Sequence, residues 1–260
     1  MYGLTAASFF AIAYLFADDD IEETPAPVDV GGYVITLPEF HKIFATVSGT
    51  HIEIDTQADH RYDATGLGRF HLRGAPSELT LSSSITSTPE YIVDNPAPTS
   101  FAIGPAWLHE GVWHSLAECE DEIVDWSVDV LEEDINECSF RVTYNLSYKE
   151  VRRVVSEYRV MRGTLEVVER VYGSVSKIRV TIPLILTDGE HESEITINRY
   201  GFTVKYLGYV YQAKSDGIGI RIGLLNVIAP NRNAKYEVGY FEVEGKAISY
   251  HLSIDRELTR

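Results

Sequence analysis

Residues 51–74, HIEIDTQADHRYDATGLGRFHLRG, hold the main concentration of side chains in this sequence that could do chemistry. Imidazole, guanidinium, carboxylate and phenol groups occur together there, although the whole chain carries a formal net charge of −17. Such a set can transfer a proton, bind an acidic sugar or hold a metal ion. It also fits a pair of salt-bridged strands without a chemical role. The side chains concerned are His51, Glu53, Asp55, His60, Tyr62, Arg69, His71 and Arg73.

Two short β-rich runs divide these groups between strand faces. In the HIEID run of residues 51–55, the imidazole and both carboxylates share one face, because side chains alternate along a strand. In the RFHLR run of residues 69–73, both guanidinium groups and the imidazole share one face. If the two strands are neighbours, acids and bases form a cross-strand ladder, in which each pair contributes about 0.2–1 kcal/mol. A structural ladder, a metal site and one wall of a saccharide-binding cleft all remain open.

A divalent metal, zinc or calcium, is the only cofactor that these residue types suggest. Imidazole and carboxylate ligands suit zinc, and the candidate ligands are His51, Glu53 and His60. The acidic segment 118–134 has the oxygen ligands that calcium prefers, but it lacks an EF-hand pattern. We interpret that segment as a solvated strand face.

A second aromatic segment, FAIGPAWLHEGVWH, covers residues 101–114. Trp107 and Trp113 are candidates for packing against sugar rings, because tryptophan with nearby polar groups commonly lines ligand pockets. The alternative is a turn whose two tryptophans close the hydrophobic core.

Charge and hydropathy exclude several classes of partner. A sequence pI near 4.8 argues against a general nucleic-acid binder, which requires clustered Lys and Arg. Residues 3–17 are apolar but too short to cross a bilayer, which takes about 20 residues. Lys42 is the first Lys or Arg, so this segment lacks the basic region of a signal peptide. Cys119 and Cys138 either pair or remain buried thiols.

Three segments organise the chain. Residues 1–17 predict a helix that is apolar around nearly its whole circumference and therefore needs burial on all sides. We expect it to be the last helix of a helical domain, which would make the chain a C-terminal fragment; the alternatives are a self-sufficient packed helix and a secretion signal. Residues 18–30 are acidic and contain prolines, as a linker does. Residues 31–260 alternate as strands, including a hairpin around Ser48-Gly49 and a short strand at 78–82, and predict an all-β domain, a large antiparallel β-sandwich.

The order of apolar helix, acidic linker and β region resembles the C-terminal β-sandwich region of the heparinase II/III-like polysaccharide lyases, which are toroid-plus-sandwich enzymes. The run HRYDATGLGRFHLRGAP at residues 60–76 is the most specific part of the resemblance. In that family an (α/α) toroid packs on a β-sandwich, and the cleft between them binds uronic-acid polysaccharides. The resemblance implies an acidic polysaccharide or oligosaccharide as substrate, an upstream helical domain of the same protein as partner, and a secreted or periplasmic location.

The chemistry implied by this resemblance is β-elimination. A base removes the C5 proton of a uronate while its carboxylate is neutralised, and an acid protonates the leaving oxygen. Tyr62 and His71 are the candidates for proton transfer, with His51 and His60 as second choices. The candidates for substrate binding are His60, Arg69, Arg73, Trp107 and Trp113.

Two other functions remain open. A glycoside hydrolase needs two carboxyl groups about 5–5.5 Å apart for retention or about 6.5–9.5 Å apart for inversion, and Glu53 and Asp55 on one strand face could meet the inverting range. The basic groups nearby favour an acidic sugar over a neutral one. The remaining possibility is a non-catalytic sandwich that packs on a catalytic domain or binds carbohydrate without cleaving it.

Overall fold

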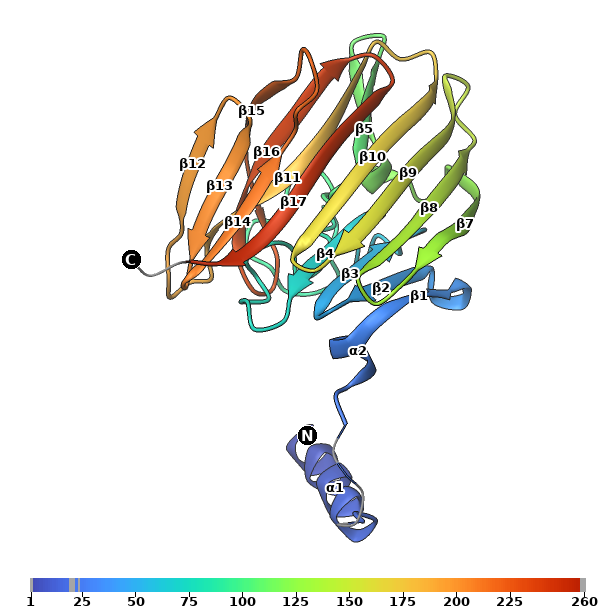
Figure 1. Ribbon diagram of the computed structural model, residues 1–260. Coiled ribbons are helices and arrows are strands. Elements are labelled where there is room, and N and C mark those ends of the chain that lie inside the picture. The colour runs from blue at the N-terminus through green and yellow to red at the C-terminus, as the bar shows by residue number, and fades with distance from the viewer. Residues whose placement is uncertain (1, 19–21, 23, 258–260) are drawn as a thin grey trace.

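The computed structural model describes residues 2–18, 22 and 24–257, and it shows an all-β fold preceded by one long helix (Figure 1). Every strand pairs antiparallel with its neighbours, in sheets of four, eight and five strands. The predicted fold class is therefore confirmed. The helices are α1 (Tyr2–Leu15) and the single turn α2 (Pro27–Val30), with 3-10 turns at Pro38–Phe40 and Leu116–Glu118.

The three sheets have simple orders. The four-stranded sheet runs β1 (Gly31–Leu37), β2 (Lys42–Val47), β3 (Thr50–Asp55), β4 (Gly66–Leu72). The eight-stranded sheet runs β12 (Glu194–Asn198), β13 (Gly201–Tyr206), β14 (Tyr209–Lys214), β17 (Ala247–Arg256), β10 (Thr164–Gly173), β9 (Val151–Met161), β8 (Glu137–Leu146), β7 (Ile123–Glu133). The five-stranded sheet runs β15 (Arg221–Pro230), β16 (Lys235–Glu244), β11 (Lys177–Thr187), β5 (Pro105–His109), β6 (Val112–Ser115).

The eight-stranded sheet forms one layer of the sandwich, and the two smaller sheets form the other. Strands β7, β8 and β9 contact β1 and β2, while β10 and β17 contact β5, β11 and β16. Alternation produces this packing: in β8, every second residue from Cys138 to Leu146 is buried. Phe140 stacks on Tyr158, and Phe202 packs against Phe241 across the layers. One continuous core results.

The hairpin predicted around Ser48-Gly49 is confirmed. Strands β2 and β3 end and begin on either side of it, and both turn residues have positive φ, 47° and 80°. A two-residue turn with two positive φ angles matches the twist of paired strands, and Gly49 takes up that conformation at little cost. This turn fixes which side chains of β2 and β3 share a face.

The prediction of a strand at residues 78–82 is wrong. Residues 73–104 form a long irregular connection between β4 and β5, with isolated bridges of Leu67 with Ile103 and of Ile85 with Phe101. The apolar alternation of that segment was real, since Leu79 and Leu81 are both buried. Their burial comes from packing over the sheet rather than from strand pairing.

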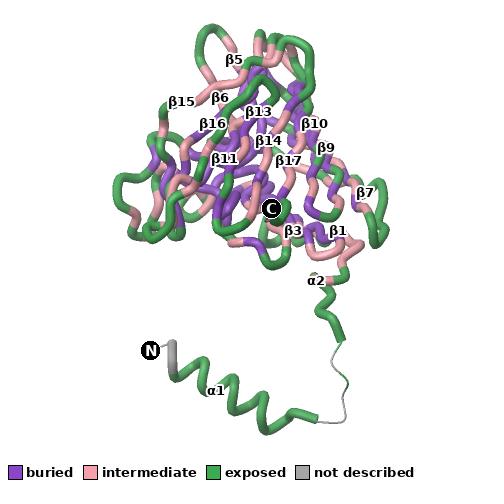
Figure 2. Tube along the Cα trace, turned by 60° about the vertical axis from the view of Figure 1, so that its left-hand side comes forward, coloured by how far each residue is buried: buried purple, intermediate pink, exposed green. Residues whose placement is uncertain are grey.

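Helix α1 is exposed around its circumference (Figure 2). The exposed fractions of Phe9, Phe10 and Phe16 are 68%, 76% and 82%. The part of the predicted linker at residues 19–21 and 23 lies outside the described residues, and its end forms α2. Among the described residues, no helix is long and apolar enough to cross a membrane. Cys119 and Cys138 are both buried free thiols, so they do not pair with each other.

Candidate functional site

The outer face of the four-stranded sheet carries the predicted ladder. His51 lies directly opposite His71, and Glu53 lies directly opposite Arg69, because β3 and β4 pair antiparallel. The Arg69 Nε lies 3.8 Å from the Glu53 Oε2. The opposite face of the same strands is buried, with side chains such as Ile52 fully inside the core. The pairing of β3 with β4 therefore brings these four polar groups together, as expected for neighbouring strands.

Lys42 joins this face from β2 and contacts three carboxylates. Its Nζ lies 2.8 Å from the Asp55 Oδ2, 3.2 Å from the Glu53 Oε1 and 3.3 Å from the Asp63 Oδ2. Burial works against the charged ammonium, but the attraction of Asp55, Asp63 and Glu53 outweighs it and raises the Lys42 pKa. Burial raises the pKa of Asp55 to about 6 although Lys42 acts in the opposite direction. The cluster therefore holds one ammonium and three carboxylates around it, and the Asp55 side chain is almost fully buried.

The two facing imidazoles have different surroundings. Burial, then the nearby Arg69 charge, lowers the pKa of His51, so its imidazole is neutral at pH 7. The His51 ring stacks on Phe44 with 5.9 Å between centroids, and its Nδ1 lies 3.2 Å from the Thr46 hydroxyl. The His71 Nε2 lies 3.0 Å from the Ala75 carbonyl oxygen, to which it donates. Both rings are therefore held by neighbours.

The two arginines of β4 and the turn after it differ in availability. The Arg69 Nε and Nη2 donate to the Ser82 carbonyl oxygen at 3.0 and 2.6 Å. Arg69 thus ties the irregular 73–104 connection to the sheet. Arg73 is 68% exposed along its side chain, and its Nη1 lies 3.2 Å from the Asp29 Oδ2. Arg73 is the more accessible guanidinium.

His60 and Tyr62 lie on the loop that joins β3 to β4. The Tyr62 hydroxyl donates to the Glu90 Oε2 at 3.2 Å, and the residue is 47% exposed. The His60 Nδ1 lies 3.7 Å from the Glu120 Oε2, while its Nε2 is buried without a hydrogen-bond partner among the described residues. This loop follows the Asp55 end of β3, where the sheet face ends.

The structure separates the two residues predicted for proton transfer. Tyr62 is on the loop that precedes Gly66, the first residue of β4, whereas His71 lies five residues farther along that strand. Five residues of extended strand span about 17 Å. His60 lies two residues from Tyr62 on the same loop, and its imidazole faces Glu120, whereas the Tyr62 hydroxyl faces Glu90.

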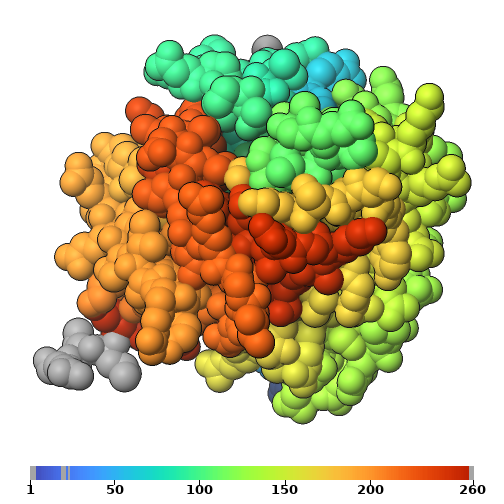
Figure 3. Space-filling model, turned by 90° about the horizontal axis from the view of Figure 1, so that it is seen from above, coloured from blue at the N-terminus to red at the C-terminus, as the bar shows by residue number. Residues whose placement is uncertain are grey.

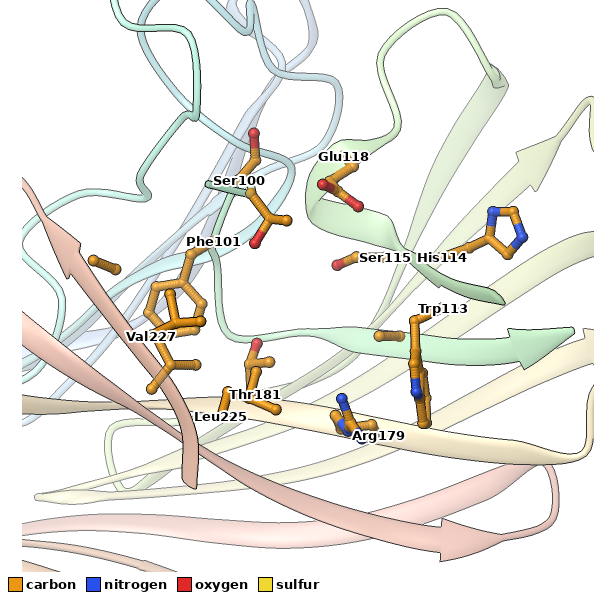
Figure 4. A pocket seen from close by; sticks show the side chains of 14 residues that line it. Ser100, Phe101, Trp113, His114, Ser115, Glu118, Arg179, Thr181, Leu225 and Val227 are labelled. Carbon is orange, nitrogen blue, oxygen red and sulfur yellow. The ribbon is translucent and has the colours of Figure 1, made fainter. Parts of the chain in front are cut away.

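Trp107 and Trp113 have unlike environments. Trp107 has no exposed surface, and its ring packs in the core between His114 and Tyr148. Its indole therefore closes the core, which is the alternative that the sequence left open, and it does not reach a surface where a sugar could bind. Trp113 is partly exposed and lines a pocket with Arg179 (Figure 4).

Sequence reasoning missed Arg179 and Glu118, which line that pocket with Trp113. The KIRVT run of β11 carries a signal for Arg179, since its alternation puts two basic side chains on one strand face. No sequence pattern connects β11 with Trp113, because the pairing of β5 with β11 joins segments about 70 residues apart.

The candidate metal ligands do not form a metal site as they are arranged. Glu53 is flanked by the charges of Lys42 and Arg69, which repel a divalent cation, and His60 lies on a separate loop. Among the described residues, no group of three or more His, Cys, Asp or Glu is placed to hold a metal ion. A role for zinc or calcium stays a prediction from the sequence.

Comparison with known proteins shows the fold. No protein-family model matches the chain, and no curated protein matches it. Among solved structures, the heparan sulfate lyase HepC from Pedobacter heparinus is similar, with 10% identity, a TM-score of 0.59, and coverage of 99% of this chain and 42% of that one. A heparinase III gene product is also similar, with 12% identity, a TM-score of 0.60, and coverage of 95% and 39%.

A hydrolase shares the same fold. The α-N-acetylgalactosaminidase NagBb from Bifidobacterium bifidum, as a quadruple mutant, has 12% identity, a TM-score of 0.53, and coverage of 83% of this chain and 36% of that one. The resemblance to the sandwich region of heparinase-like lyases is confirmed at the level of the fold. The chain spans about two fifths of the length of the structures it resembles.

Proposed function

We propose that this chain is the β-sandwich part of a polysaccharide lyase that cleaves uronic-acid-containing glycans by β-elimination. The observation that carries the proposal is the position of Tyr62. Its half-exposed phenol is oriented by the Glu90 carboxylate, on a loop beside a sheet face that carries Arg69, with Arg73 in the turn after that strand. The fold shared with heparin lyases supports the same substrate class.

In the proposed mechanism, the Tyr62 hydroxyl is the acid that protonates the leaving glycosidic oxygen. Its hydroxyl donates to Glu90 in the free protein, which keeps the phenol oxygen in a fixed place. Protonation of the leaving glycosidic oxygen by a positioned phenol contributes roughly 10²–10⁴-fold to a rate. His60 is the imidazole on the same loop and is our first choice for the partner base. His71, a first choice from the sequence, becomes the second candidate here, because about 17 Å of strand separates it from the start of β4.

In this proposal Arg73 binds a different part of the substrate from Tyr62. Arg73 and His71 lie at the far end of β4 from the Tyr62 loop. A polymer that crosses the sheet face would therefore place the carboxylate of a neighbouring sugar unit near Arg73. Guanidinium groups bind carboxylates through paired hydrogen bonds, so Arg73 would align the chain without touching the bond that breaks.

A helical domain belongs to the same proposal. The exposed apolar circumference of α1 supports a helical partner that covers it, as the resemblance to toroid-plus-sandwich enzymes implies. The cleft between that domain and the sheet face would hold the polymer. A secreted or periplasmic location is also part of the proposal and rests on the resemblance.

The test is a lyase assay of the chain, and of any longer protein that contains it, on a panel of uronate polysaccharides. The readout is the ultraviolet absorbance of the unsaturated uronate product. We expect Tyr62→Phe and His60→Ala each to lower kcat at least 100-fold, while Arg141→Ala, on the far sheet, leaves it unchanged. A normal rate in Tyr62→Phe would overturn the proposed mechanism.

A non-catalytic role is the second candidate. The observation that favours it is the hydrolase NagBb, in which the same fold occurs in an enzyme of another class. In that case the sandwich packs on a catalytic domain or binds carbohydrate. New reducing ends without ultraviolet absorbance would indicate a hydrolase, and retained binding without either product would indicate a binding module.

A further inference from the structure

A pocket of about 290 Å³ lies at the five-stranded sheet, apart from the ladder on the four-stranded sheet. Segments far apart in the sequence surround it: residues 99–101, the β6 region from Trp113 to Glu118, and strands β11 and β15 (Figure 4). Figure 3 shows the green β5–β6 hairpin and the deep-orange β15 segment on the same face of the molecule. The pocket is therefore a product of the tertiary fold.

The Arg179 guanidinium, at the β11 side of the pocket, is already paired. Its Nε and Nη2 both donate to the Glu242 Oε2, at 3.1 and 2.5 Å. Its guanidinium carbon also lies 3.9 Å from the ring centroid of Trp113 and 4.6 Å from that of Tyr240. The remaining charged groups beside Glu242 line a separate pocket together with it; they are Lys177, Arg221 and Glu244. Arg179 therefore offers little net charge to a ligand in this pocket.

The Glu118 carboxylate lies across the pocket from Arg179 (Figure 4). Among the described residues, no hydrogen bond or ion pair engages this carboxylate. Partial burial raises the pKa of Glu118, although the imidazoles of His60 and His114 act in the opposite direction. Burial removes part of the hydration of the carboxylate, and no donor on the protein replaces it. A cationic group that enters the pocket can make that missing interaction.

The surface between these two charged groups is mainly apolar. It is made by Phe101, Leu225, Val227 and Val238. Apolar groups of a ligand are stabilised on such a surface by about 25 cal/mol for each Å² that leaves water. A small inorganic cation gains nothing from this surface. The lining therefore suits a positive charge that is carried on an apolar body.

We propose that this pocket binds a small organic ammonium compound, with its nitrogen at the Glu118 carboxylate and its apolar body against Phe101 and Val227. A primary ammonium has three N–H donors, so it can also donate to a hydroxyl oxygen that lines the pocket, such as that of Ser115. A volume of about 290 Å³ is at the lower end of small-molecule pockets, which run from about 300 to 1,000 Å³, and suits a ligand with a single ring. The net charge of −17 attracts cations at long range. Binding requires no cleavage, so the proposal does not depend on the lyase mechanism.

The test is a calorimetric titration of the chain at neutral pH with three ligands of similar shape: cyclohexylmethylammonium, cyclohexylmethanol and cyclohexanecarboxylate. We expect the ammonium compound to bind roughly tenfold more tightly than the alcohol, because only its charge pairs with Glu118, and the carboxylate to bind most weakly, because Glu118 repels it. Equal affinity for the ammonium compound and the alcohol, tightest binding of the carboxylate, or no binding of the ammonium compound would overturn the proposal.

A charge variant tests the role of Glu118. Glu118→Gln keeps the shape of the side chain and should weaken binding of the ammonium compound roughly tenfold, while the affinity for the alcohol stays the same. The matched control is Glu110→Gln, on the turn between β5 and β6, which removes the same charge from a side chain that is 86% exposed and does not line the pocket. It should leave both affinities unchanged. Undiminished binding of the ammonium compound in Glu118→Gln would contradict the assignment.

A filling variant locates the site. Val227→Phe occupies the pocket without removing a charge and should abolish binding of the ammonium compound, whereas Ile228→Phe, at the adjacent 53% exposed position that does not line the pocket, should leave it unchanged. Circular dichroism checks the fold of each variant. Tyr62→Phe should bind the ammonium compound normally even though the lyase proposal requires it to lose activity, so the two proposals fail separately. Normal binding in a folded Val227→Phe would show that the ligand lies elsewhere.

Discussion

Two charged sheet faces of this molecule look alike in sequence and differ in structure. The outer face of the eight-stranded sheet carries a ladder in which Arg141 lies 2.8 Å from Glu157, and Arg170 lies 2.7 Å from the same carboxylate. The face of the four-stranded sheet carries Lys42 among three carboxylates and an Arg69 bonded to a backbone carbonyl. Both are cross-strand arrangements of acids and bases.

The two faces differ in how much their charged side chains are exposed to solvent. The Arg141 and Glu157 side chains are 39% and 27% exposed, while Asp55 is 5% exposed. On the eight-stranded sheet, hydrogen bonds from Arg170 and Arg141 lower the pKa of Glu157. On the four-stranded sheet, burial raises the pKa of Asp55 to about 6. The opposite directions mark the first face as a solvated structural ladder and the second as a candidate site, since perturbed carboxylates cluster at functional positions.

The largest expected effect is the loss of Lys42. Lys42→Met leaves Asp55 and Glu53 close together with no ammonium between them, and breaking such a buried pair costs about 3–5 kcal/mol. The free energy of unfolding in urea measures it. A loss below about 1 kcal/mol would make this face equivalent to the solvated ladder.

The pH dependence of stability is expected to differ in sign between the faces. The folded pKa of Asp55, about 6, lies above its ordinary value of 3.8, so its contribution is fully present below about pH 4 and is lost as the pH rises through 6. The free energy of unfolding falls by about 3 kcal/mol over this range, at 1.36 kcal/mol per unit of difference between the folded and ordinary pKa. Glu157, whose pKa is lowered, contributes the opposite way: its stabilisation is lost as the pH falls.

The measurement is urea unfolding from pH 4 to pH 8 in the wild type, Asp55→Asn and Glu157→Gln. The buried Glu169, whose pKa burial raises to about 7, adds a dependence of the same sign as Asp55, so only the difference between wild type and Asp55→Asn isolates Asp55. A difference that does not vary with pH would contradict the burial of an ionisable Asp55.

A smaller effect is expected for the exposed arginine of the candidate face. Arg73→Ala should leave the unfolding free energy within about 0.5 kcal/mol, because its ion pair with Asp29 is at the surface. Binding of an acidic oligosaccharide should weaken about fivefold, which corresponds to the loss of about 1 kcal/mol. The matched control is Arg141→Ala, whose affinity should equal that of the wild type in the same titration.

The smallest effect is expected on the solvated ladder. Arg141→Met should cost less than about 1 kcal/mol, and the cost should shrink further in 1 M salt, because exposed ion pairs are screened. Urea unfolding at low and high salt provides the comparison. A cost as large as that of Lys42→Met would mean that exposure does not distinguish the two faces.

The sequence by itself determined the fold class, the hairpin around Ser48-Gly49 and which side chains share a face within HIEID and within RFHLR, because these depend on alternation and turn chemistry between neighbours in the chain. It did not determine that Leu79 and Leu81 are buried without strand pairing, that Trp107 lies in the core, or that Tyr62 lies on the loop before β4 while His71 lies near the other end of that strand.

Only the tertiary structure decided where the pocket is. Arg179 meets Trp113 because β5 pairs with β11, and Lys42 reaches Asp63 because the loop after β3 folds back. Local patterns specify which face a side chain takes. They do not specify which distant strand lies alongside, since that choice depends on the packing of the whole core and on how much solvent it leaves around each charge.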